Sequence, residues 1–378
     1  MRANRLYLSN FRNYEEQSVE FSPGINVIFG DNAQGKTNIL EAVHMFSLGK
    51  SNRTHRDSEL IRHGETSAKI ELEFEGGGRE FEAVVEIVRN KGKSIKVNDI
   101  PVRRNSELIG RFNVVYFGPE YLGMVKEGPG KRRRNLDVLI SQLKPAYFSA
   151  LSDLRKIVES KNAILKMQNP NATMLGIMNE KLINISAVLI KYRSRYIKEI
   201  GEIAAEIQKK ISGDKETLTV RYVSCIGAAD GLDEAEIKRR MAEKIEKNSE
   251  REKTRMETLI SPHRDDIIYE INGKEAKAYA SQGQQKTIVL VEKLAEVELI
   301  SREIGESPVL LLDDIMSELD KKRQAFILSN IKGMQIIITC TDIEEFGNLD
   351  NFNRIYVENA VISANGYNNY NEPETAAN

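Results

Sequence analysis

The run Ile25-Asn26-Val27-Ile28-Phe29-Gly30-Asp31-Asn32-Ala33-Gln34-Gly35-Lys36-Thr37 decides the fold of this chain. A β-branched run, a loop that begins and ends with glycine, and apolar residues at helical spacing after it predict a strand, a phosphate-binding loop (P-loop) and a helix. Gly30 and Gly35 let the backbone N–H groups turn inward, and the start of the helix adds positive charge, so the loop favours phosphate. We expect Lys36 to neutralise the β- and γ-phosphates and Thr37 to offer its hydroxyl to Mg²⁺. The alternative is a glycine-rich turn that matches by chance.

Length and composition limit the class of protein. The chain has 378 residues, 40% of them hydrophobic, and a net charge of −1. These values predict a soluble globular protein with a main domain and a second lobe, and exclude a uniformly basic nucleic-acid binder. Cys225 and Cys340 have no spacing typical of zinc sites or disulfides, so we expect a reducing cytoplasm. No window approaches 18 uncharged apolar residues and the first residues lack a signal core, so we expect neither secretion nor membrane spanning.

Alternating apolar and polar residues predict β-structure on both sides of the P-loop. Residues 5–8 and 17–21 are expected to form two strands around a turn at residues 10–14, and residues 68–100 to form an antiparallel meander. Residues 112–117 predict a further strand. Antiparallel strands together with a P-loop indicate a mixed head rather than a plain doubly wound sheet.

The middle of the chain, from residue 131 to about residue 258, is helix-rich. Apolar residues spaced alternately three and four apart run from Leu175 to Tyr196, and this stripe continues to Ile207. The spacing predicts coiled-coil-like packing, with the helix that contains Leu151 and Leu165 as its partner. Interleaved charges at residues 234–255 predict a solvated helix face.

Two carboxylates follow the apolar run Val309-Leu310-Leu311-Leu312, which reads as a strand buried on both faces. Asp313 and Asp314 then lie at the carboxyl end of a strand, where ligands bind in α/β sheets. Successive side chains of an extended segment diverge, so we expect one of the two acids to hold Mg²⁺ with Thr37 and the other to act as general base. Two solvated acids at a strand end are the alternative.

With these motifs the chain resembles the ABC-type ATPase heads of the SMC superfamily, and most closely the RecF family of recombination mediators. The resemblance covers most of the chain, in five blocks that occur in order. They are Asn10-Phe11-Arg12-Asn13-Tyr14, the P-loop, Ser261-Pro262-His263-Arg264-Asp265-Asp266, Ser281-Gln282-Gly283-Gln284-Gln285-Lys286, and Leu311-Leu312-Asp313-Asp314-Ile315-Met316-Ser317-Glu318-Leu319-Asp320.

The resemblance implies ATP and Mg²⁺ as cofactors and a nucleotide held between two copies of the head. It implies catalytic roles for Lys36 and Asp314 and metal binding by Thr37 and Asp313. The implied nucleotide-binding residues are Arg12, Asn13, Gly30, Asp31, Asn32, Ala33, Gln34, Gly35, Lys36, Thr37 and Asn38. The implied signature, which contacts the other copy's nucleotide, is Ser281, Gln282, Gly283 and Gln284. The implied D-loop is Ser317, Glu318, Leu319 and Asp320.

Two features depart from the general ABC pattern. The signature lacks a double glycine, and Thr339-Cys340-Thr341-Asp342 has no histidine where a switch histidine is usual. Both departures are shared with the RecF pattern, so they argue against a transporter. From the residues alone, Ser281 and Gln284 have capping-box spacing, which predicts a helix N-terminus with exposed N–H groups.

DNA contact is predicted from local basic clusters. The candidates are Arg103, Arg104, Lys131, Arg132, Arg133 and Arg134, and a solvated charge run is the alternative. The chain has no Trp, and aromatic residues are not interleaved with the basic run, so duplex or junction backbone contact is favoured over base stacking.

We therefore expect an α/β fold: an ABC-type P-loop ATPase head with a mixed sheet, made of residues 1–125 and 259–362. An inserted helical, short coiled-coil-like arm is expected at 126–258 and a disordered tail at 363–378. The resemblance implies a weak DNA-dependent ATPase of the cytoplasm that dimerises on ATP and DNA at gaps or junctions. It implies RecO and RecR as partners in loading RecA, with slow hydrolysis as the reset and no membrane. A P-loop small-molecule kinase and a structural SMC-like linker protein are the alternatives.

Overall fold

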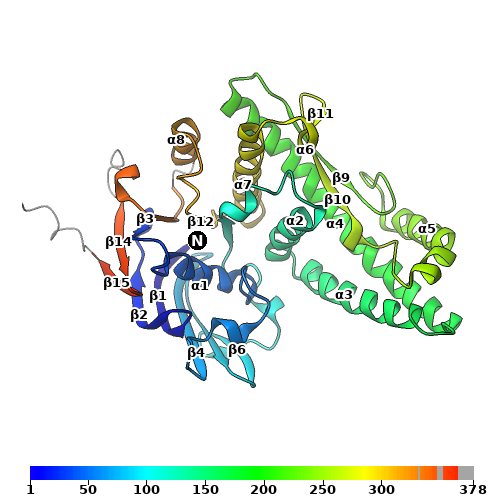
Figure 1. Cartoon of the computed structure of the whole chain (residues 1–378), viewed down its shortest axis with the longest axis horizontal. Coiled ribbons are helices and arrows are strands. Elements are labelled where there is room, and N and C mark those ends of the chain that lie inside the picture. Colours follow the sequence, from blue (N-terminus) through cyan, green and yellow to red (C-terminus); the bar gives the residue numbers. More distant parts are fainter. Residues whose placement is uncertain (331–332, 347–351, 365–378) are drawn as a thin grey trace, which may run out of the picture. The chain divides into compact units, whose positions relative to one another are not determined.

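A computed structural model of the chain describes residues 1–330, 333–346 and 352–364 (Figure 1). The chain divides into two compact units, one made of Met1–Pro119 with Ile300–Asn378 and the other of Glu120–Leu299. The first unit is thus assembled from both ends of the chain. The boundaries expected from the sequence, at residues 126 and 258, differ from these and stay a prediction.

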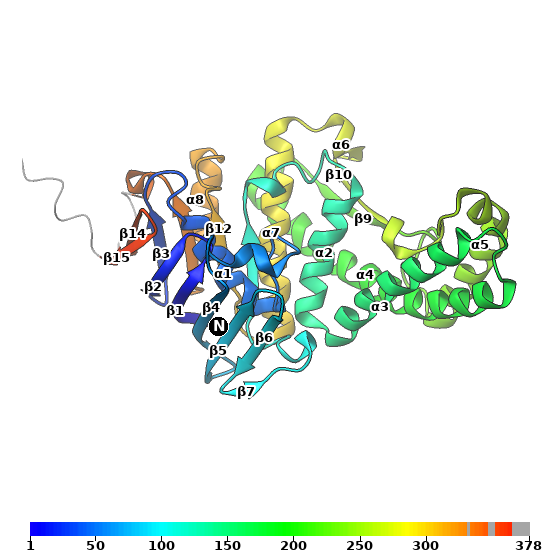
Figure 2. The ribbon, with the colours of Figure 1, turned by 60° about the horizontal axis from the view of Figure 1, so that its bottom comes forward.

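The first unit contains a six-stranded antiparallel sheet with the order β2-β1-β4-β5-β6-β7. Figure 2 shows β1, β4, β5 and β6 side by side. The strands are β1 (Arg2–Phe11), β2 (Tyr14–Glu20), β4 (Ser67–Gly76), β5 (Arg79–Val88), β6 (Gly92–Val97) and β7 (Ile100–Pro101). The meander predicted over residues 68–100 is confirmed.

The first hairpin is longer than expected. Phe11 pairs directly with Tyr14 across the turn, and both side chains are buried. The turn therefore consists of Arg12 and Asn13 alone, and Arg12 has a left-handed φ of 54°. Burial of the two aromatic side chains extends β1 and β2 beyond the residues whose alternation is visible in the sequence.

The second sheet of this unit has the order β15-β14-β3-β13-β12-β8, and all neighbours are parallel except β14 and β15. The strands are β3 (Ile25–Phe29), β8 (Val114–Phe117), β12 (Val309–Asp313), β13 (Ile336–Cys340), β14 (Asn353–Glu358) and β15 (Val361–Ala364). Helix α1 (Lys36–Leu48) contacts strands of both sheets, and α8 (Lys321–Asn330) follows β12. The tail prediction is wrong for residues 363 and 364, which pair with β14 in β15; residues 365–378 lie outside the described residues.

The second unit is mostly helical. Its helices are α2 (Pro129–Leu143), α3 (Pro145–Leu165), α4 (Ala172–Ser212), α5 (Glu234–Arg255) and α6 (Ala276–Tyr279), and α7 (Gln282–Ile304) begins here. The apolar stripe of α4 packs on α3 and α5, as the spacing predicted for α3. A three-stranded sheet of β11 (Lys274–Glu275), β10 (Asp266–Ile271) and β9 (Leu218–Val223) lies against α4, and β9 was not expected within the helix-rich region. Short 3-10 turns are η1 (Asp57–Leu60), η2 (Asn105–Glu107), η3 (Pro119–Tyr121), η4 (Pro262–Arg264) and η5 (Ile343–Phe346).

Helix α4 has a long apolar surface. Among the described residues it is the one helix whose length and composition would allow it to cross a membrane, with a mean hydropathy of 1.3 in its most apolar window. The side chains of Leu182, Leu189 and Ile190 are fully buried within the unit. Core helices of folded domains have the same composition.

Candidate functional site

The P-loop begins where β3 ends, and α1 begins at Lys36. Gly30 and Gly35 have φ values of 142° and 113°, which L side chains rarely adopt. The ammonium of Lys36 donates to the carbonyl oxygens of Gly30 at 2.5 Å and Asp31 at 2.7 Å. Burial lowers the pKa of Lys36. The loop therefore holds its one cation against its own carbonyl groups, where an incoming phosphate can compete for it.

Asp313 comes from the other end of the chain and reaches the first turn of α1. Its Oδ1 accepts from the hydroxyl of Thr37 at 2.9 Å and from that of Thr339 at 2.7 Å, and its Oδ2 accepts from Tyr116 at 2.7 Å. Asp313 is 4% exposed. Three hydroxyl groups from α1, β8 and β13 thus fix one carboxylate. Because the single proton of Thr37 is committed to Asp313, the lone pairs of the Thr37 oxygen remain for a cation.

The donor set suits Mg²⁺ only in part. No three His, Cys, Asp or Glu side chains of the described residues gather into a group that could hold a metal ion. Mg²⁺ bound at Thr37 and Asp313 must therefore take further oxygens from phosphates and water, which is its usual coordination in nucleotide sites.

Asp314 differs from its neighbour in conformation and environment. It has a left-handed φ of 48°, and its N–H donates to Thr339 Oγ1 at 2.9 Å. Its side chain is more exposed than that of Asp313. Burial raises the pKa of Asp314, while the charge of Lys36 lowers it. The two acids therefore differ in conformation and environment, and the separate tasks expected of them stay predictions.

The turn of Arg12 and Asn13 lies against the P-loop. Asn13 Nδ2 donates to the Gln34 carbonyl oxygen at 3.0 Å, and Asn13 Oδ1 accepts from Asn38 at 2.8 Å. Arg12 makes a bidentate pair with Glu41 of α1, with N–O distances of 2.9 and 2.7 Å. The turn is thereby fixed beside residues 34–38.

Glu41 is a residue that sequence reasoning missed. Its side chain is fully buried, yet it accepts from Arg12, from Ser51 at 2.5 Å and from Arg53 at 3.1 Å. A carboxylate among the apolar residues of a helix was the available signal, because buried carboxylates need paired donors.

The candidate signature residues begin α7. Ser281 and Gln284 form the predicted capping box: the Ser281 N–H donates to Gln284 Oε1 at 2.8 Å, and the Gln284 N–H donates to Ser281 Oγ at 3.2 Å. Gln282 and Gly283 are the first two residues of the helix. These two bonds fix the first turn of α7, and the role of this helix start in anion binding stays a prediction.

The candidate D-loop is a compact turn after Asp314. Ser317 donates through its hydroxyl to the Asp314 carbonyl oxygen at 3.1 Å, and Leu319 is buried. Asp320 accepts the Arg323 N–H at 2.9 Å and so caps α8. Glu318 is exposed. The turn is thus tied to the acid pair at one end and to a helix start at the other.

The basic clusters divide into exposed and buried residues. Arg103, Arg104, Lys131 and Arg134 are exposed, and Lys131 pairs with Glu127 at 2.7 Å. The DNA assignment of Arg132 is wrong, because Arg132 is 3% exposed and makes a bidentate pair with Asp266 at 2.8 and 3.0 Å.

Arg133 is half-buried and donates to the Asp265 carbonyl oxygen at 2.7 Å; burial and the charge of Arg193 lower its pKa. Arg132 and Arg133 therefore make hydrogen bonds within the second unit.

The block that contains Asp265 is a structural centre of the second unit. Asp265 is buried and accepts from Arg193 at 3.0 Å, from the Cys225 N–H at 2.7 Å and from the hydroxyl of Tyr222. Arg193 was also missed by sequence reasoning, because its partners are distant in the chain and it lies in an apolar helix. These contacts place Asp265 in the interior of the helical unit, where it serves packing of the unit.

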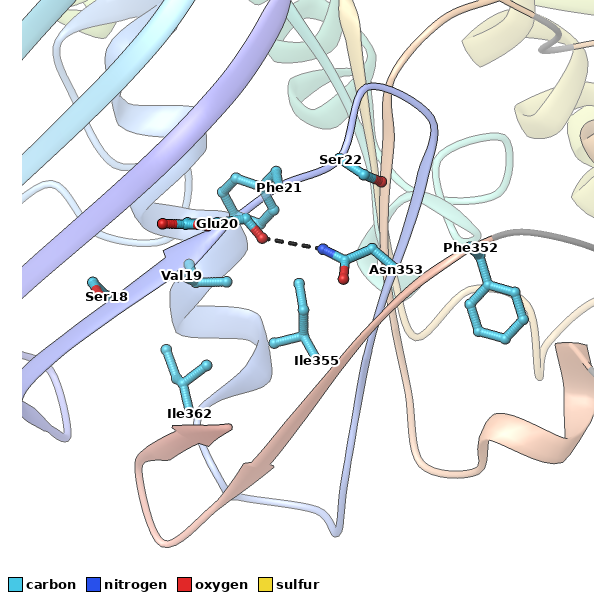
Figure 3. Close-up of a pocket in the computed structure, with 9 residues that line it drawn as sticks. All are labelled: Ser18, Val19, Glu20, Phe21, Ser22, Phe352, Asn353, Ile355 and Ile362. Atoms are coloured by element: carbon cyan, nitrogen blue, oxygen red, sulfur yellow. Dashed lines mark hydrogen bonds between the residues drawn. The ribbon is translucent and has the colours of Figure 1, made fainter. Parts of the chain in front are cut away.

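A pocket of about 720 Å³ lies apart from the P-loop, between β2 and the β14–β15 hairpin (Figure 3). Asn353 Nδ2 donates across it to the Glu20 carbonyl oxygen at 3.1 Å. Its lining is mixed, with Phe21, Ile355 and Ile362 as apolar members. None of the predicted site residues lines it.

The chain matches the family model described as RecF/RecN/SMC N terminal domain over residues 3–363. It is 39% identical over 360 residues to the "DNA replication and repair protein RecF" of Acetivibrio thermocellus, covering 94% of this chain and 98% of that protein. The protein of the same name from Alkaliphilus oremlandii is 41% identical over 349 residues, covering 92% and 96%.

Solved structures agree with this fold. "Structure of the recombination mediator protein RecF-ATPrS in RecFOR pathway" superposes with a TM-score of 0.90 at 33% identity, over 96% of this chain and 98% of that one. An Smc head bound to the C-winged helix domain of ScpA gives a TM-score of 0.54 at 19% identity and shows the fold alone. The matched family model, the relatives and the shared mixed α/β architecture with a helical insertion lead to one conclusion: this chain belongs to the RecF family.

Proposed function

We propose that this chain is an ATP-dependent DNA-binding protein of recombinational repair that hydrolyses ATP slowly. The 2.9 Å hydrogen bond between Thr37 Oγ1 and Asp313 Oδ1 carries the proposal, because it joins the P-loop to an acid pair from the other end of the chain. ATP-bound relatives with the same fold support ATP as the nucleotide.

In this proposal each residue has one task. The backbone N–H groups of the P-loop bind the phosphates, and Lys36 exchanges its loop carbonyls for phosphate oxygens. Thr37 and Asp313 would hold Mg²⁺, which when bound would neutralise charge on the phosphates. Asp314 takes a proton from the attacking water, and the Asp314 pKa that burial raises makes it a better base.

Dimerisation and partners belong to the same proposal. The start of α7 binds the γ-phosphate held by a second copy of the chain, and the turn at residues 317–320 lies at the dimer axis. DNA binding depends on exposed cations such as Arg103, Arg104 and Arg134. Two solved relatives, described as RecF-ATPrS and RecF-ATP, are called recombination mediators in the RecFOR pathway, which supports RecO and RecR as partners. Loading of RecA and action in the cytoplasm are further parts of the proposal.

Gel filtration with and without ATP and a short duplex tests this function. We expect the unmodified chain to elute as a dimer with ATP and the Lys36→Ala chain to remain a monomer. Lys210→Ala, which removes an exposed lysine of α4, is the matched control. Undiminished ATP-dependent dimerisation of the Lys36→Ala chain would contradict the proposal.

A mixing experiment tests the arrangement in trans. Ser281→Arg and Lys36→Ala chains are each expected to be inactive, whereas a mixed dimer retains one intact composite site. Partial recovery of phosphate release on mixing is the expected result, and no recovery counts against a shared site. Transfer of the γ-phosphate to a metabolite instead of water would favour a kinase.

A further inference from the structure

Thr339 has a hydroxyl group that contacts both acids of the candidate site. Its Oγ1 donates to Asp313 Oδ1 at 2.7 Å and accepts the Asp314 N–H at 2.9 Å. Thr339 is 1% exposed and lies near the carboxyl end of β13, in register with Asp313 of β12. It begins the quartet Thr339-Cys340-Thr341-Asp342, which lacks the histidine usual at this place.

The contact to Asp314 is made at a strained position of the backbone. A φ of 48° is uncommon for a residue other than glycine, so the surrounding contacts must hold it. The Asp314 N–H points to both oxygens of Thr339, at 2.9 Å from the hydroxyl and 3.2 Å from the carbonyl. Thr339 therefore holds the backbone turn from which the Asp314 side chain extends.

The contact to Asp313 is one of three. Thr37 and Thr339 donate to Oδ1 and Tyr116 donates to Oδ2. Tyr116 therefore provides a comparison: it orients the same carboxylate from β8, whereas the Asp314 N–H donates to Thr339. Each hydroxyl has one hydrogen, so Thr339 can serve Asp313 as donor and Asp314 as acceptor at the same time.

We propose that Thr339 is a positioning residue that sets the orientations of the metal-holding and proton-accepting carboxylates together. The inference rests on the proposed ATPase function and names the residue that links the two acids. Loss of a residue that orients a metal ligand typically costs about 10- to 100-fold in metal affinity or activity. Thr339 therefore affects both properties, whereas Tyr116 affects metal binding more than turnover.

The first test measures binding of a slowly hydrolysed ATP analogue with and without Mg²⁺. Thr339→Val keeps the shape of the side chain and removes the hydroxyl. We expect it to reduce the Mg²⁺-dependent gain in analogue affinity by about tenfold or more and to leave affinity without Mg²⁺ within about twofold. Tyr116→Phe is expected to give a similar loss, and Thr339→Ser to restore most of the gain.

The second test separates turnover from binding. At saturating ATP and Mg²⁺ we expect kcat to fall by about tenfold or more in Thr339→Val and by less in Tyr116→Phe, because Thr339→Val loses the hydroxyl that accepts the Asp314 N–H. Wild-type Mg²⁺ dependence and kcat in Thr339→Val would overturn the inference. So would equal defects in Thr339→Ser and Thr339→Val, which would assign the effect to packing of the methyl group.

The melting temperature of each variant without nucleotide is the control for folding. If Thr339→Val does not fold, Thr339→Ser is compared with Tyr116→Phe instead. Wild-type Mg²⁺ dependence and kcat in Thr339→Ser support the inference. A defect in Thr339→Ser as large as that in Tyr116→Phe refutes it. Failure of the unmodified protein to bind ATP would instead contradict the proposed function.

Discussion

Replacing Arg193 by Met is expected to destabilise the helical unit strongly. The guanidinium is 2% exposed and donates to Asp265 Oδ2 at 3.0 Å, to Asp137 Oδ1 at 2.9 Å and to the Pro262 carbonyl oxygen at 2.6 Å. Methionine fills much of the same volume without a charge, so the variant leaves the fully buried Asp265 carboxylate without its cation. Removing one partner of a buried ion pair costs about 3–5 kcal/mol.

The matched control lies two residues further along the same helix. Arg195 is 53% exposed and pairs with Glu199 one helical turn away at 2.7 Å. Exposed pairs of this kind contribute about 0.3–0.5 kcal/mol, and the contact of Arg195 with the Tyr196 ring adds a similar amount. Arg195→Met is therefore expected to lose about 1 kcal/mol or less.

Urea unfolding followed by circular dichroism measures both variants. The chain has no Trp, so tyrosine fluorescence is a second probe of the same transition. Burial raises the pKa of Asp265 while Arg193 lowers it, so removing Arg193 raises this pKa further. A folded state with the higher pKa binds protons up to a higher pH, and the deficit of Arg193→Met should therefore be smaller at pH 5 than at pH 8.

A double variant tests the cause of the loss. Arg193→Met with Asp265→Asn removes the uncompensated charge, so it is expected to be more stable than Arg193→Met alone. A loss of less than about 1 kcal/mol in Arg193→Met, or a double variant no more stable than the single one, would refute the reasoning.

Three further predictions concern a buried glutamate, the basic run and the P-loop. Burial and the neighbouring Glu296 carboxylate raise the pKa of Glu292 to about 7. A folded state with this higher pKa loses stability as pH rises from about 4.5 to about 7, so the stability of Glu292→Gln relative to the unmodified chain should increase between pH 5 and pH 8. A stability difference that stays constant in urea unfolding at these two pH values would contradict the prediction. If Arg134 contacts one phosphate, Arg134→Gln should reduce the log-log salt slope of duplex binding by about 0.9, and a slope equal to that of the unmodified chain would remove Arg134 from the interface. Arg132→Gln should instead lower the melting temperature, because Arg132 is buried. Gly30→Ala should abolish ATP binding, since its Cβ would lie 2.2 Å from a carbonyl oxygen of β14 at a φ of 142°, while Gly24→Ala, with nothing within 4 Å, should bind ATP normally.

The sequence by itself determined the local parts of this protein. Glycines at fixed positions, a lysine and a threonine between a strand and a helix can form few structures other than a P-loop, because the requirement is local backbone geometry. The run at residues 309–312 predicted a buried strand for a similar reason, since a short apolar run that ends in two acids is typical of a strand covered on both faces. Ser281 and Gln284 predicted a helix start because a capping box lies within one turn of chain.

Tertiary structure decided which distant residues meet. The pairing of Thr37 with Asp313 was anticipated through the order of motifs, but the contributions of Tyr116 and Thr339 to the same carboxylate were not, because hydroxyl groups near strand ends are common in any sequence. Arg132 shows the reverse case. In the sequence it belongs to a basic run, and only the position of Asp266 on β10 made it an internal ion pair. A run of charged residues in the sequence does not show which of them are buried, because burial depends on contacts between segments that are far apart in the chain. Only the folded structure therefore distinguishes buried cations from exposed cations that can bind phosphate.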